Sequence, residues 1–218
     1  VADADTGYGN ALNVMRTIEE VEHAGASAAS IEDTVLPLRF GASGGDEVLS
    51  LEESVGKMKA AVAARRDPSF VVLGRTSALK AEGLEGACRR AKAYAAAGVD
   101  AIFVVGLETV EQAAAIHAAA GIPLVIGTAP AAITADLLAP AGARVLLLGH
   151  QPLAAAAKAL HETYTHLYNG GAPGDLKGKI ASGPEMDAYT NGAAYRAAPT
   201  LLAELGAKRA MEADRYIA

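Results

Sequence analysis

The sequence has 218 residues, 51% of them hydrophobic and 20% charged, so it can bury a full core and lacks the composition of a disordered or fibrous chain. Its formal net charge of -6 argues against a nucleic-acid or anionic-membrane surface, because either needs a basic patch. The apolar runs are too short for a membrane span. The single cysteine, Cys88, is interpreted as a buried helix thiol rather than a nucleophile, and it fits a reducing, cytoplasmic compartment.

In chain order, short apolar or β-branched runs alternate with longer segments of helical periodicity, the pattern of β-loop-α units around a parallel sheet. Strands are predicted at residues 1–4, 28–32, 70–75, 101–105, 124–127 and 145–148. Helices are predicted between them at 11–23, 51–64, 85–97, 110–119 and 133–138, with Gly25, Gly98, Gly121 and Gly142 as C-terminal caps. A helix at 152–167, a glycine-rich link at 169–174 and short helices from Glu185 and at 199–208 follow.

Such repeated units fit either an open doubly wound sheet or part of a closed barrel. Polar residues gather at the C-terminal ends of several strands, and no GxGxxG turn follows a strand, so we favour a (β/α)8 TIM-type barrel. Such a barrel usually needs about 250 residues, and the chain opens like the end of a strand. We therefore expect residues 1–168 to form strands three to eight, without the first two. Residues 169–218 would be a linker and a C-terminal helical tail that packs on the barrel or on a neighbouring subunit.

The strongest local signal is the segment Asp3-Ala4-Asp5-Thr6-Gly7-Tyr8-Gly9-Asn10. Residues two apart in a strand point the same way, so Asp3 and Asp5 are expected to present two carboxylates on one side of a strand end. The next strand delivers Glu32 and Asp33 at the same end of the barrel. Carboxylates that converge need a cation between them, and an oxygen-only set suits Mg²⁺ or Mn²⁺ with water as further ligands. The alternative is that one aspartate caps the following helix and the other is solvated.

Two more candidate site residues follow strands. The guanidinium of Arg75 could clamp a substrate carboxylate through two parallel donors, with an ion pair to a neighbouring acid as the alternative. His150 could orient a substrate or donate a proton, with a structural or capping role as the alternative. The other four histidines fall in helical segments and are interpreted as surface or packing residues. The long loop at residues 36–45 is interpreted as a lid rather than a disordered surface loop.

The segments Asp3 to Asn10, Ile31-Glu32-Asp33 and Gly74-Arg75-Thr76, in this order on successive strands, resemble the isocitrate lyase and phosphoenolpyruvate mutase superfamily. The resemblance covers residues 1–167. It implies a β/α barrel that binds Mg²⁺ and an oxo-acid or its enolate. It further implies that Asp3 ligates the metal directly, that Asp5 and Glu32 hold its water ligands, and that Arg75 clamps a substrate carboxylate. A homotetramer is also implied, since the superfamily commonly forms tetramers that exchange a C-terminal helix.

The loop at residues 38–42 departs from two subgroups of this superfamily. It lacks the cysteine that serves isocitrate and methylisocitrate lyases in proton transfer, and it lacks the lysine and asparagine of the phosphonate-forming mutases. Other segments resemble the oxaloacetate decarboxylases instead, namely residues 9–17, 31–34, Leu36-Pro37, Phe40-Gly41 and Gly149-His150.

The resemblance therefore implies a Mg²⁺-dependent carbon–carbon lyase, a carboxy-lyase that converts oxaloacetate, or another small anionic 2-oxo acid, to pyruvate through an enolate. Residues 127–132 lack the aromatic and amide groups that the decarboxylases carry there, so the identity of the 2-oxo acid stays open. One alternative is a phosphonopyruvate or carboxyphosphonoenolpyruvate mutase or hydrolase, for which Arg39 is the candidate cation of the lid. Another is a catalytically silent barrel.

Overall fold

The structure is a computed structural model that describes residues 1–38, 40–41, 47–149 and 151–198, together with residues 200, 203 and 206. Contacts within the chain define two compact units, Val1–Gly149 and His150–Ala218. The sheet lies in the first unit, and the helix predicted at 152–167 falls in the second. The domain boundary at residue 168 stays a prediction.

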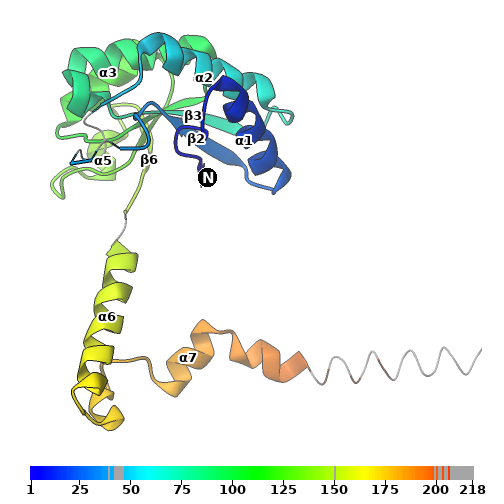
Figure 1. The fold of residues 1–218 in the computed structure, drawn as a ribbon, viewed down its shortest axis with the longest axis vertical. Helices are drawn as coiled ribbons and strands as arrows, with labels where there is room; N and C mark the ends of the chain where they lie inside the picture. The colour runs from blue at the N-terminus through cyan, green and yellow to red at the C-terminus, as the bar shows by residue number, and fades with distance from the viewer. Residues whose placement is uncertain are drawn as a thin grey trace, which may run out of the picture. The chain divides into compact units, whose positions relative to one another are not determined.

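The first unit is built on a parallel sheet whose six strands follow chain order from β1 to β6 (Figure 1). Each strand pairs in parallel with the next one along the chain. A doubly wound sheet would reverse its order at a switch point, whereas a barrel adds strands in sequence. The predicted fold class is therefore confirmed, as a curled half-barrel with these strands: β1 (Ala2–Asp3), β2 (Ala28–Glu32), β3 (Val71–Thr76), β4 (Ala101–Val104), β5 (Leu124–Ile126) and β6 (Ala143–Leu146).

Helices alternate with these strands, and α1, α2 and α3 lie along one face of the sheet in Figure 1. The two predicted helices 11–23 and 51–64 are confirmed, and each begins after a side-chain cap, from Asn10 and Ser50. The third begins at Ala78 rather than at residue 85. A short first segment precedes Gly83, and the φ of 71° at Gly83 interrupts the helix between this segment and the predicted part. The helices are α1 (Ala11–His23), α2 (Leu51–Ala64), α3 (Ala78–Ala97), α4 (Val110–Ala120) and α5 (Ala135–Leu138).

The two faces of the sheet bury different side chains, because alternate residues of a strand point to opposite faces. The outer face packs against the helices in the main core, to which β3 contributes Val72. The inner face carries a smaller cluster that contains Leu73 and Phe103. Arg75 follows Leu73 at the same spacing, so the inner face of β3 ends in a charged residue at the carboxyl end of the strand.

β6 begins at Ala143 rather than at residue 145. The prediction followed the apolar run that starts at Val145, but Val145 is 45% exposed, whereas Ala143 is buried against the helices. The pairing of β6 with β5 also shifts register between Leu124 and Val125. The strand is therefore placed by the small residue that packs outward, not by the most apolar stretch.

The second unit contains α6 (Gln151–Tyr168), a 3₁₀ turn η1 (Pro173–Leu176) and α7 (Gly183–Tyr189). α6 buries none of its residues and exposes large hydrophobic side chains, among them Leu153, Leu160 and Tyr164. The predicted helix at 199–208 lies mostly outside the described residues. Packing of this tail on the barrel or on a neighbouring subunit stays a prediction.

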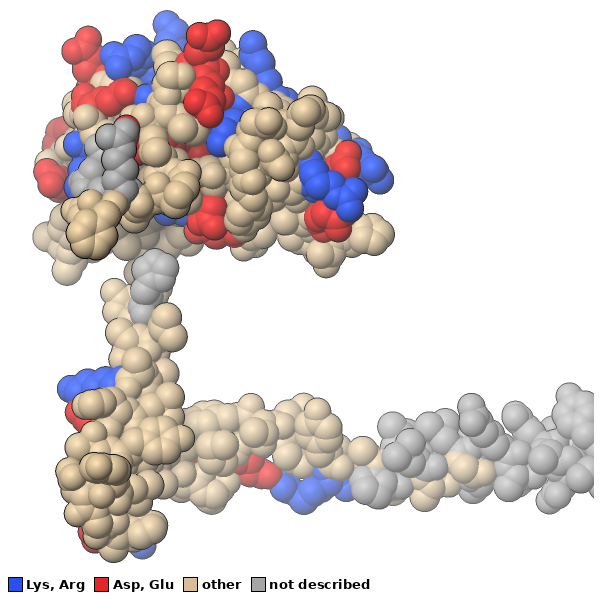
Figure 2. All heavy atoms as spheres, viewed as in Figure 1, with Lys and Arg blue, Asp and Glu red and all other residues tan. Residues whose placement is uncertain are grey.

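Charged side chains of both signs are mixed on the face of the first unit that Figure 2 shows. Figure 2 shows lysine and arginine interspersed with aspartate and glutamate on the face in view. In the described part of the chain, no helix has both the length and the apolarity that crossing a bilayer requires. The predicted lack of a nucleic-acid partner stays a prediction.

Candidate functional site

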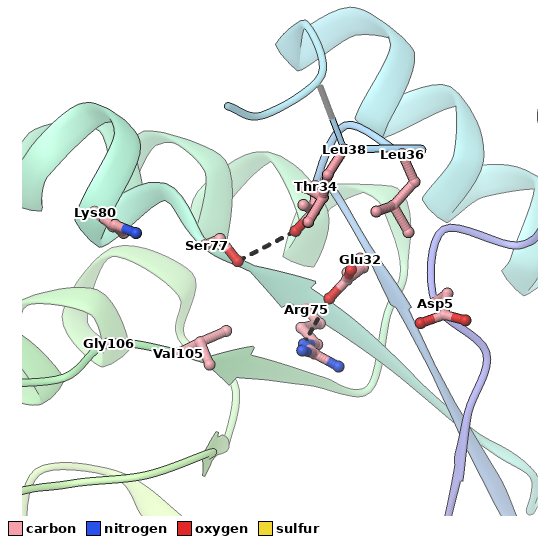
Figure 3. Close-up of a pocket in the computed structure, with 10 residues that line it drawn as sticks. All are labelled: Asp5, Glu32, Thr34, Leu36, Leu38, Arg75, Ser77, Lys80, Val105 and Gly106. Carbon is pink, nitrogen blue, oxygen red and sulfur yellow. Dashed lines mark hydrogen bonds and ion pairs between the residues drawn. The ribbon is translucent and has the colours of Figure 1, made fainter. Parts of the chain in front are cut away.

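A cavity of about 390 Å³ opens at the carboxyl ends of the strands of the first unit (Figure 3). Its size lies in the range of small-molecule pockets, and parallel α/β proteins bind their ligands at this end of the sheet. Loops and strand ends from β1 to β4 contribute its lining, which consists of Asp5, Glu32, Thr34, Leu36, Leu38, Arg75, Ser77, Lys80, Val105 and Gly106.

Arg75 joins two of the predicted carboxylates at the edge of this cavity. Its Nη1 donates a hydrogen bond to Asp3 Oδ2 at 2.7 Å, and its Nε lies 2.8 Å from Glu32 Oε2. The second contact is an ion pair without the alignment of a hydrogen bond, so Glu32 Oε2 and Arg75 Nε are buried without a hydrogen-bond partner among the described residues. Asp3, Glu32 and Arg75 thus meet at one end of the sheet. The ion pair that was the alternative for Arg75 is present, and its substrate role stays a prediction.

The sheet fixes Arg75 from two sides. Its Cα is in register with that of Glu32 on β2 and with that of Phe103 on β4. The guanidinium lies over the Phe103 ring, 5.1 Å from the centroid, which adds a cation–π contact. The charged group of Arg75 is therefore held in place before any ligand arrives.

Glu32 is the most buried acid of this cluster. Burial raises the pKa of its carboxyl, and nearby Asp3 raises the pKa further, while the positive charge of Arg75 lowers it. A buried carboxylate with a second acid beside it is stabilised by additional positive charge. The electrostatics of the cluster therefore favour the binding of a cation next to Glu32.

Asp5 lines the cavity, but not for the reason that the sequence suggested. β1 ends at Asp3, and Asp5 adopts a left-handed conformation with φ of 45°. Its backbone N–H donates to Asp3 Oδ1 at 3.2 Å, and its carbonyl accepts from Glu32 N at 2.8 Å. A turn, rather than the pleat of a strand, therefore directs Asp5 to the cavity.

The turn that follows Asp5 is held by buried contacts. Gly7 has φ of 77°, and a Cβ on it would lie 2.4 Å from a methyl carbon of Val14. Asn10 and Asn13 form a reciprocal capping box at the start of α1. Lys57, buried on α2, donates to the Thr6 carbonyl at 3.1 Å. The segment that resembles the superfamily therefore has a structural role in placing Asp3 and Asp5.

Asp33 is not part of the acidic cluster, which corrects the sequence interpretation. Glu32 and Asp33 are adjacent and point to opposite faces of the sheet, because side chains alternate along a strand. Asp33 is fully buried and accepts hydrogen bonds from Thr76 Oγ1 at 2.7 Å, Ser77 N at 3.0 Å and Tyr94 Oη at 2.7 Å. These donors satisfy its carboxylate without a metal.

Arg90 of α3 completes this buried network on the outer face. Its Nη1 lies 3.5 Å from Asp33 Oδ2, its Nη2 donates to Glu82 at 2.6 Å, and the same nitrogen donates to the Leu49 carbonyl at 2.7 Å. Burial alone would lower the pKa of Arg90, but the contacts with Glu82, Tyr94 and Asp33 together outweigh it and raise the pKa. Leu49 N also donates to Asp33 O, so the network ties both ends of the loop between β2 and α2. Leu36 and Leu38 of this loop line the cavity; the lid role stays a prediction.

The carboxylates do not form a ready-made metal cage. Among the described residues, no group of three or more histidine, cysteine, aspartate or glutamate side chains converges closely enough to hold an ion. Arg75 instead occupies the space between Asp3 and Glu32. The all-oxygen donor set, and the Oε2 of Glu32 that has no hydrogen-bond partner among the described residues, nevertheless fit Mg²⁺, which keeps several water ligands and needs few direct contacts to protein.

His150 and Arg39, both named from the sequence, lie outside the described residues. The other histidines occupy helices as predicted, and His117, for example, contacts the Ile122 carbonyl through its Nδ1. Cys88 packs half-buried against the core, and burial raises the pKa of its thiol, which fits the predicted structural role. Residues 127–132 do not line the cavity.

Three polar residues of the cavity were missed from the sequence, namely Thr34, Ser77 and Lys80. Thr34 Oγ1 and Ser77 Oγ lie 3.3 Å apart. The available signal was their position directly after β2 and β3, where side chains of a parallel sheet reach its ligand-binding end.

The curled parallel sheet, with a charged cavity at the carboxyl ends of its strands, is of the (β/α)-barrel class. A family model described as phosphoenolpyruvate phosphomutase matches residues 1–168. The chain belongs to this family, and the resemblance found in the sequence is thereby confirmed.

Similar proteins extend this assignment. An oxaloacetate decarboxylase from Bradyrhizobium diazoefficiens is 49% identical over 82% of this chain and 62% of its own length. A crystal structure of phosphoenolpyruvate phosphomutase from Streptomyces platensis subsp. rosaceus matches with a TM-score of 0.78 at 33% identity, over 89% of this chain and 70% of its own. A phosphonopyruvate hydrolase complexed with oxalate and Mg²⁺ matches with a TM-score of 0.74 at 34% identity, over 90% and 70%. The chain spans 62 to 66% of the length of the curated relatives that it matches.

Proposed function

We propose that this protein is a Mg²⁺-dependent carbon–carbon lyase that decarboxylates oxaloacetate, or a closely related 2-oxo acid, to pyruvate. The observation that carries the proposal is the meeting of Asp3, Glu32 and Arg75 at the edge of a cavity that Asp5 also lines. The 49% identity to an oxaloacetate decarboxylase supports the choice of substrate. Cytoplasmic location and homotetrameric assembly stay predictions.

The proposed roles follow the chemistry of each side chain. Asp3 would hold Mg²⁺ directly, Asp5 and Glu32 would hold it through water, and Mn²⁺ could replace it. The bound cation supplies electron withdrawal at the 2-oxo group of the substrate. Arg75, held against Phe103, would donate to a substrate carboxylate and fix its orientation.

The reaction itself breaks the bond between C3 and C4 of oxaloacetate. Carbon dioxide departs, and the electron pair of the broken bond remains on pyruvate as an enolate. His150 or a water molecule would deliver the proton to C3. Leu36 and Leu38 would keep bulk water from the enolate until that proton arrives.

The test is pyruvate formation by the purified protein from oxaloacetate and Mg²⁺. We expect a rate well above that of Mg²⁺ alone, and loss of the excess rate with EDTA. Arg75→Met should lower kcat/KM by about 100-fold or more, because a buried charge on the substrate would lose its partner. Arg144→Met is the matched control, since Arg144 also lies on a strand but outside the cavity. A rate no better than that of free Mg²⁺ contradicts the proposal.

A second candidate is phosphonopyruvate hydrolysis or mutation, which the similarity to a phosphonopyruvate hydrolase and to a phosphoenolpyruvate phosphomutase favours. Assaying phosphonopyruvate beside oxaloacetate separates the two, because only one should be turned over efficiently. A catalytically silent barrel is the remaining alternative, and an absence of Mg²⁺ binding in calorimetry would support it.

A further inference from the structure

Two of the acids that are proposed to hold the metal face the same cation, Arg75. Its Nη1 donates to Asp3 Oδ2 at 2.7 Å, and its Nε lies 2.8 Å from Glu32 Oε2. Figure 3 shows the contact with Glu32 at the edge of the cavity. Mg²⁺ would need oxygens of these same two acids, so the metal and the guanidinium are alternative partners of one pair of carboxylates. A role of Arg75 in substrate binding alone leaves these two contacts unexplained.

Asp3 presents one of its two oxygens to the cation. Its Oδ1 accepts from Asp5 N at 3.2 Å and from Ser30 Oγ at 3.5 Å, so the protein itself fixes the direction of the carboxylate. Its Oδ2 accepts from Arg75. A divalent cation on Oδ2 would lie close to the guanidinium, and two positive charges at such a distance repel each other strongly in partly buried surroundings. Arg75 therefore opposes the binding of Mg²⁺ to Asp3 for as long as it keeps this contact.

The contacts of Arg75 suit an exchange better than a permanent pairing. The contact with Glu32 lacks the alignment of a hydrogen bond, so Glu32 Oε2 and Arg75 Nε are each buried without a hydrogen-bond partner among the described residues. The Asp3 side chain is 59% exposed, and water weakens an ion pair that it can reach. A cation with a higher charge can thus replace the guanidinium at both acids.

Arg75 keeps its place at the cavity without the two acids. Its guanidinium lies over the Phe103 ring, 5.1 Å from the centroid, and the residue lines the cavity. A carboxylate binds a guanidinium through two parallel N–H groups, and each such pair contains Nε or Nη1, the nitrogens that face the acids. An anionic ligand therefore competes with the acids for Arg75, just as Mg²⁺ competes with Arg75 for the acids.

We propose that Arg75 is the internal counter-cation of Asp3 and Glu32, and that it exchanges with Mg²⁺ at these carboxylates. Binding of the metal releases Arg75 from the acids and leaves its paired donors for the carboxylate of the substrate. Metal and substrate then favour each other's binding, because each replaces a partner in the same ion pairs, and this coupling is reciprocal. The inference rests on the proposed function for the identity of the metal and its ligands, and it adds how the protein couples metal binding to substrate binding.

The test measures Mg²⁺ binding without any oxo-acid, so that it does not depend on turnover. Calorimetric titration at pH 8, where carboxyl groups are ionised, gives Kd for Mg²⁺ of the unmodified protein, Arg75→Met and Arg75→Lys. Arg75→Lys keeps the positive charge but loses the fork of donors that spans both acids. Arg144→Met is the matched control, because it removes an arginine from a strand outside the cavity.

Arg75→Met should tighten Mg²⁺ binding by about tenfold, the value of ion pairs that are partly open to solvent. Arg75→Lys should tighten it by a smaller factor, because one ammonium can satisfy only one of the two acids. Arg144→Met should change Kd by less than about twofold. A role of Arg75 in substrate binding alone predicts instead that no variant binds Mg²⁺ more tightly.

A second measurement follows Arg75 itself in the unmodified protein. The arginine Nε–H resonance that disappears from the ¹⁵N NMR spectrum in Arg75→Lys belongs to Arg75. It should shift when Mg²⁺ is added, because the Nε–H group then loses its contact with Glu32. This resonance carries the test if Arg75→Met does not fold.

The proposal is overturned if Arg75→Met binds Mg²⁺ no more tightly than the unmodified protein, or if the Nε–H resonance is unchanged by Mg²⁺. It is also overturned if Arg75→Lys matches the unmodified protein, since charge alone would then explain the effect, or if the unmodified protein binds no Mg²⁺. Its failure is distinguishable from that of the proposed function. Tighter Mg²⁺ binding by Arg75→Met without turnover of oxaloacetate rejects the decarboxylase and supports the exchange, whereas turnover with an unchanged Kd for Mg²⁺ does the opposite.

Discussion

The carboxyl ends of β2 and β3 carry an ionic group on each face of the sheet. On the outer face, Asp33 is fully buried and accepts from three donors while Arg90 lies beside it. On the inner face, Glu32 and Arg75 face each other with one buried atom each that lacks a hydrogen-bond partner among the described residues. Glu32 and Asp33 are neighbours in sequence, yet the outer carboxylate is fully hydrogen-bonded, whereas the inner ion pair leaves one atom of each partner without a hydrogen bond.

The difference shows how one strand pair can serve stability and ligand binding at once. The hydrogen bond from Thr76 to Asp33 on the outer face links the same two strands that bring Arg75 to Glu32 on the inner face. The outer group therefore holds the strand register in which Glu32 and Arg75 face the cavity. Variants of the outer group should change the stability of the fold, and variants of the inner group should change what the protein binds.

The largest expected effect is on the outer face. Arg90→Met should lower the free energy of unfolding by about 3–5 kcal/mol, because it leaves the buried carboxylate of Asp33 without its cation. Urea unfolding measures the loss. Arg89→Met is the matched control, since Arg89 contacts the same Glu82 from a half-exposed position and should cost no more than about 1 kcal/mol.

Equal costs for Arg89→Met and Arg90→Met would contradict a structural role for the outer group. If Arg90→Met does not fold, Arg90→Lys provides the measurement, because it keeps the charge but loses part of the fork of hydrogen bonds. Arg90→Lys should then fold, with a free energy of unfolding lower than that of Arg89→Met.

The second expected effect separates two adjacent acids. Glu32→Gln should weaken Mg²⁺ binding by roughly 10–100-fold while the metal-free protein keeps its stability, since burial already disfavours the charge of Glu32. Asp33→Asn should do the reverse, with Mg²⁺ affinity kept and about 1.5–3 kcal/mol of stability lost. Calorimetric titration with Mg²⁺ and urea unfolding of both variants test the pair. Loss of Mg²⁺ affinity in Asp33→Asn alone would exchange the two assignments.

Much of the fold could be predicted because its signals are local. α1 and α2 were predicted to the residue, since side-chain caps at Asn10 and Ser50 precede helical periodicity. The start of α3 was missed because Gly83 interrupts the periodicity, and the extra first segment is stabilised by contacts that only the folded chain has, such as those of Glu82 with Arg90.

The site could be predicted only in part. Glu32 and Arg75 were expected at one edge, where the structure has them, because the carboxyl ends of parallel strands share that edge of the sheet. The sequence also allowed the prediction that Asp33 points away from Glu32, since side chains alternate along a strand. Counting Asp33 with the other acids of the strand ends overlooked this. Asp5 was expected at this edge for a different reason, because a left-handed turn and not the pleat of a strand directs it to the cavity. The contacts of Arg90 and Tyr94 with Asp33 could not be placed either, because they join residues more than fifty positions apart.

The smallest expected effect concerns Lys57, a buried cation that, like Arg90, serves the fold, here by donating to the Thr6 carbonyl. Burial lowers the pKa of its amine from 10.5, and Glu53 only partly opposes this. In the alkaline range below 10.5 the folded protein therefore holds the Lys57 proton less tightly than the unfolded chain, and stability rises with pH there.

The advantage in unfolding free energy of the unmodified protein over Lys57→Met should grow across this range. Lys59→Met, which removes an exposed lysine of the same helix, gives the baseline for urea unfolding at each pH. A difference that shrinks as pH rises would mean that Lys57 is stabilised as a cation, and would move it from the structural group to the charges that serve the cavity.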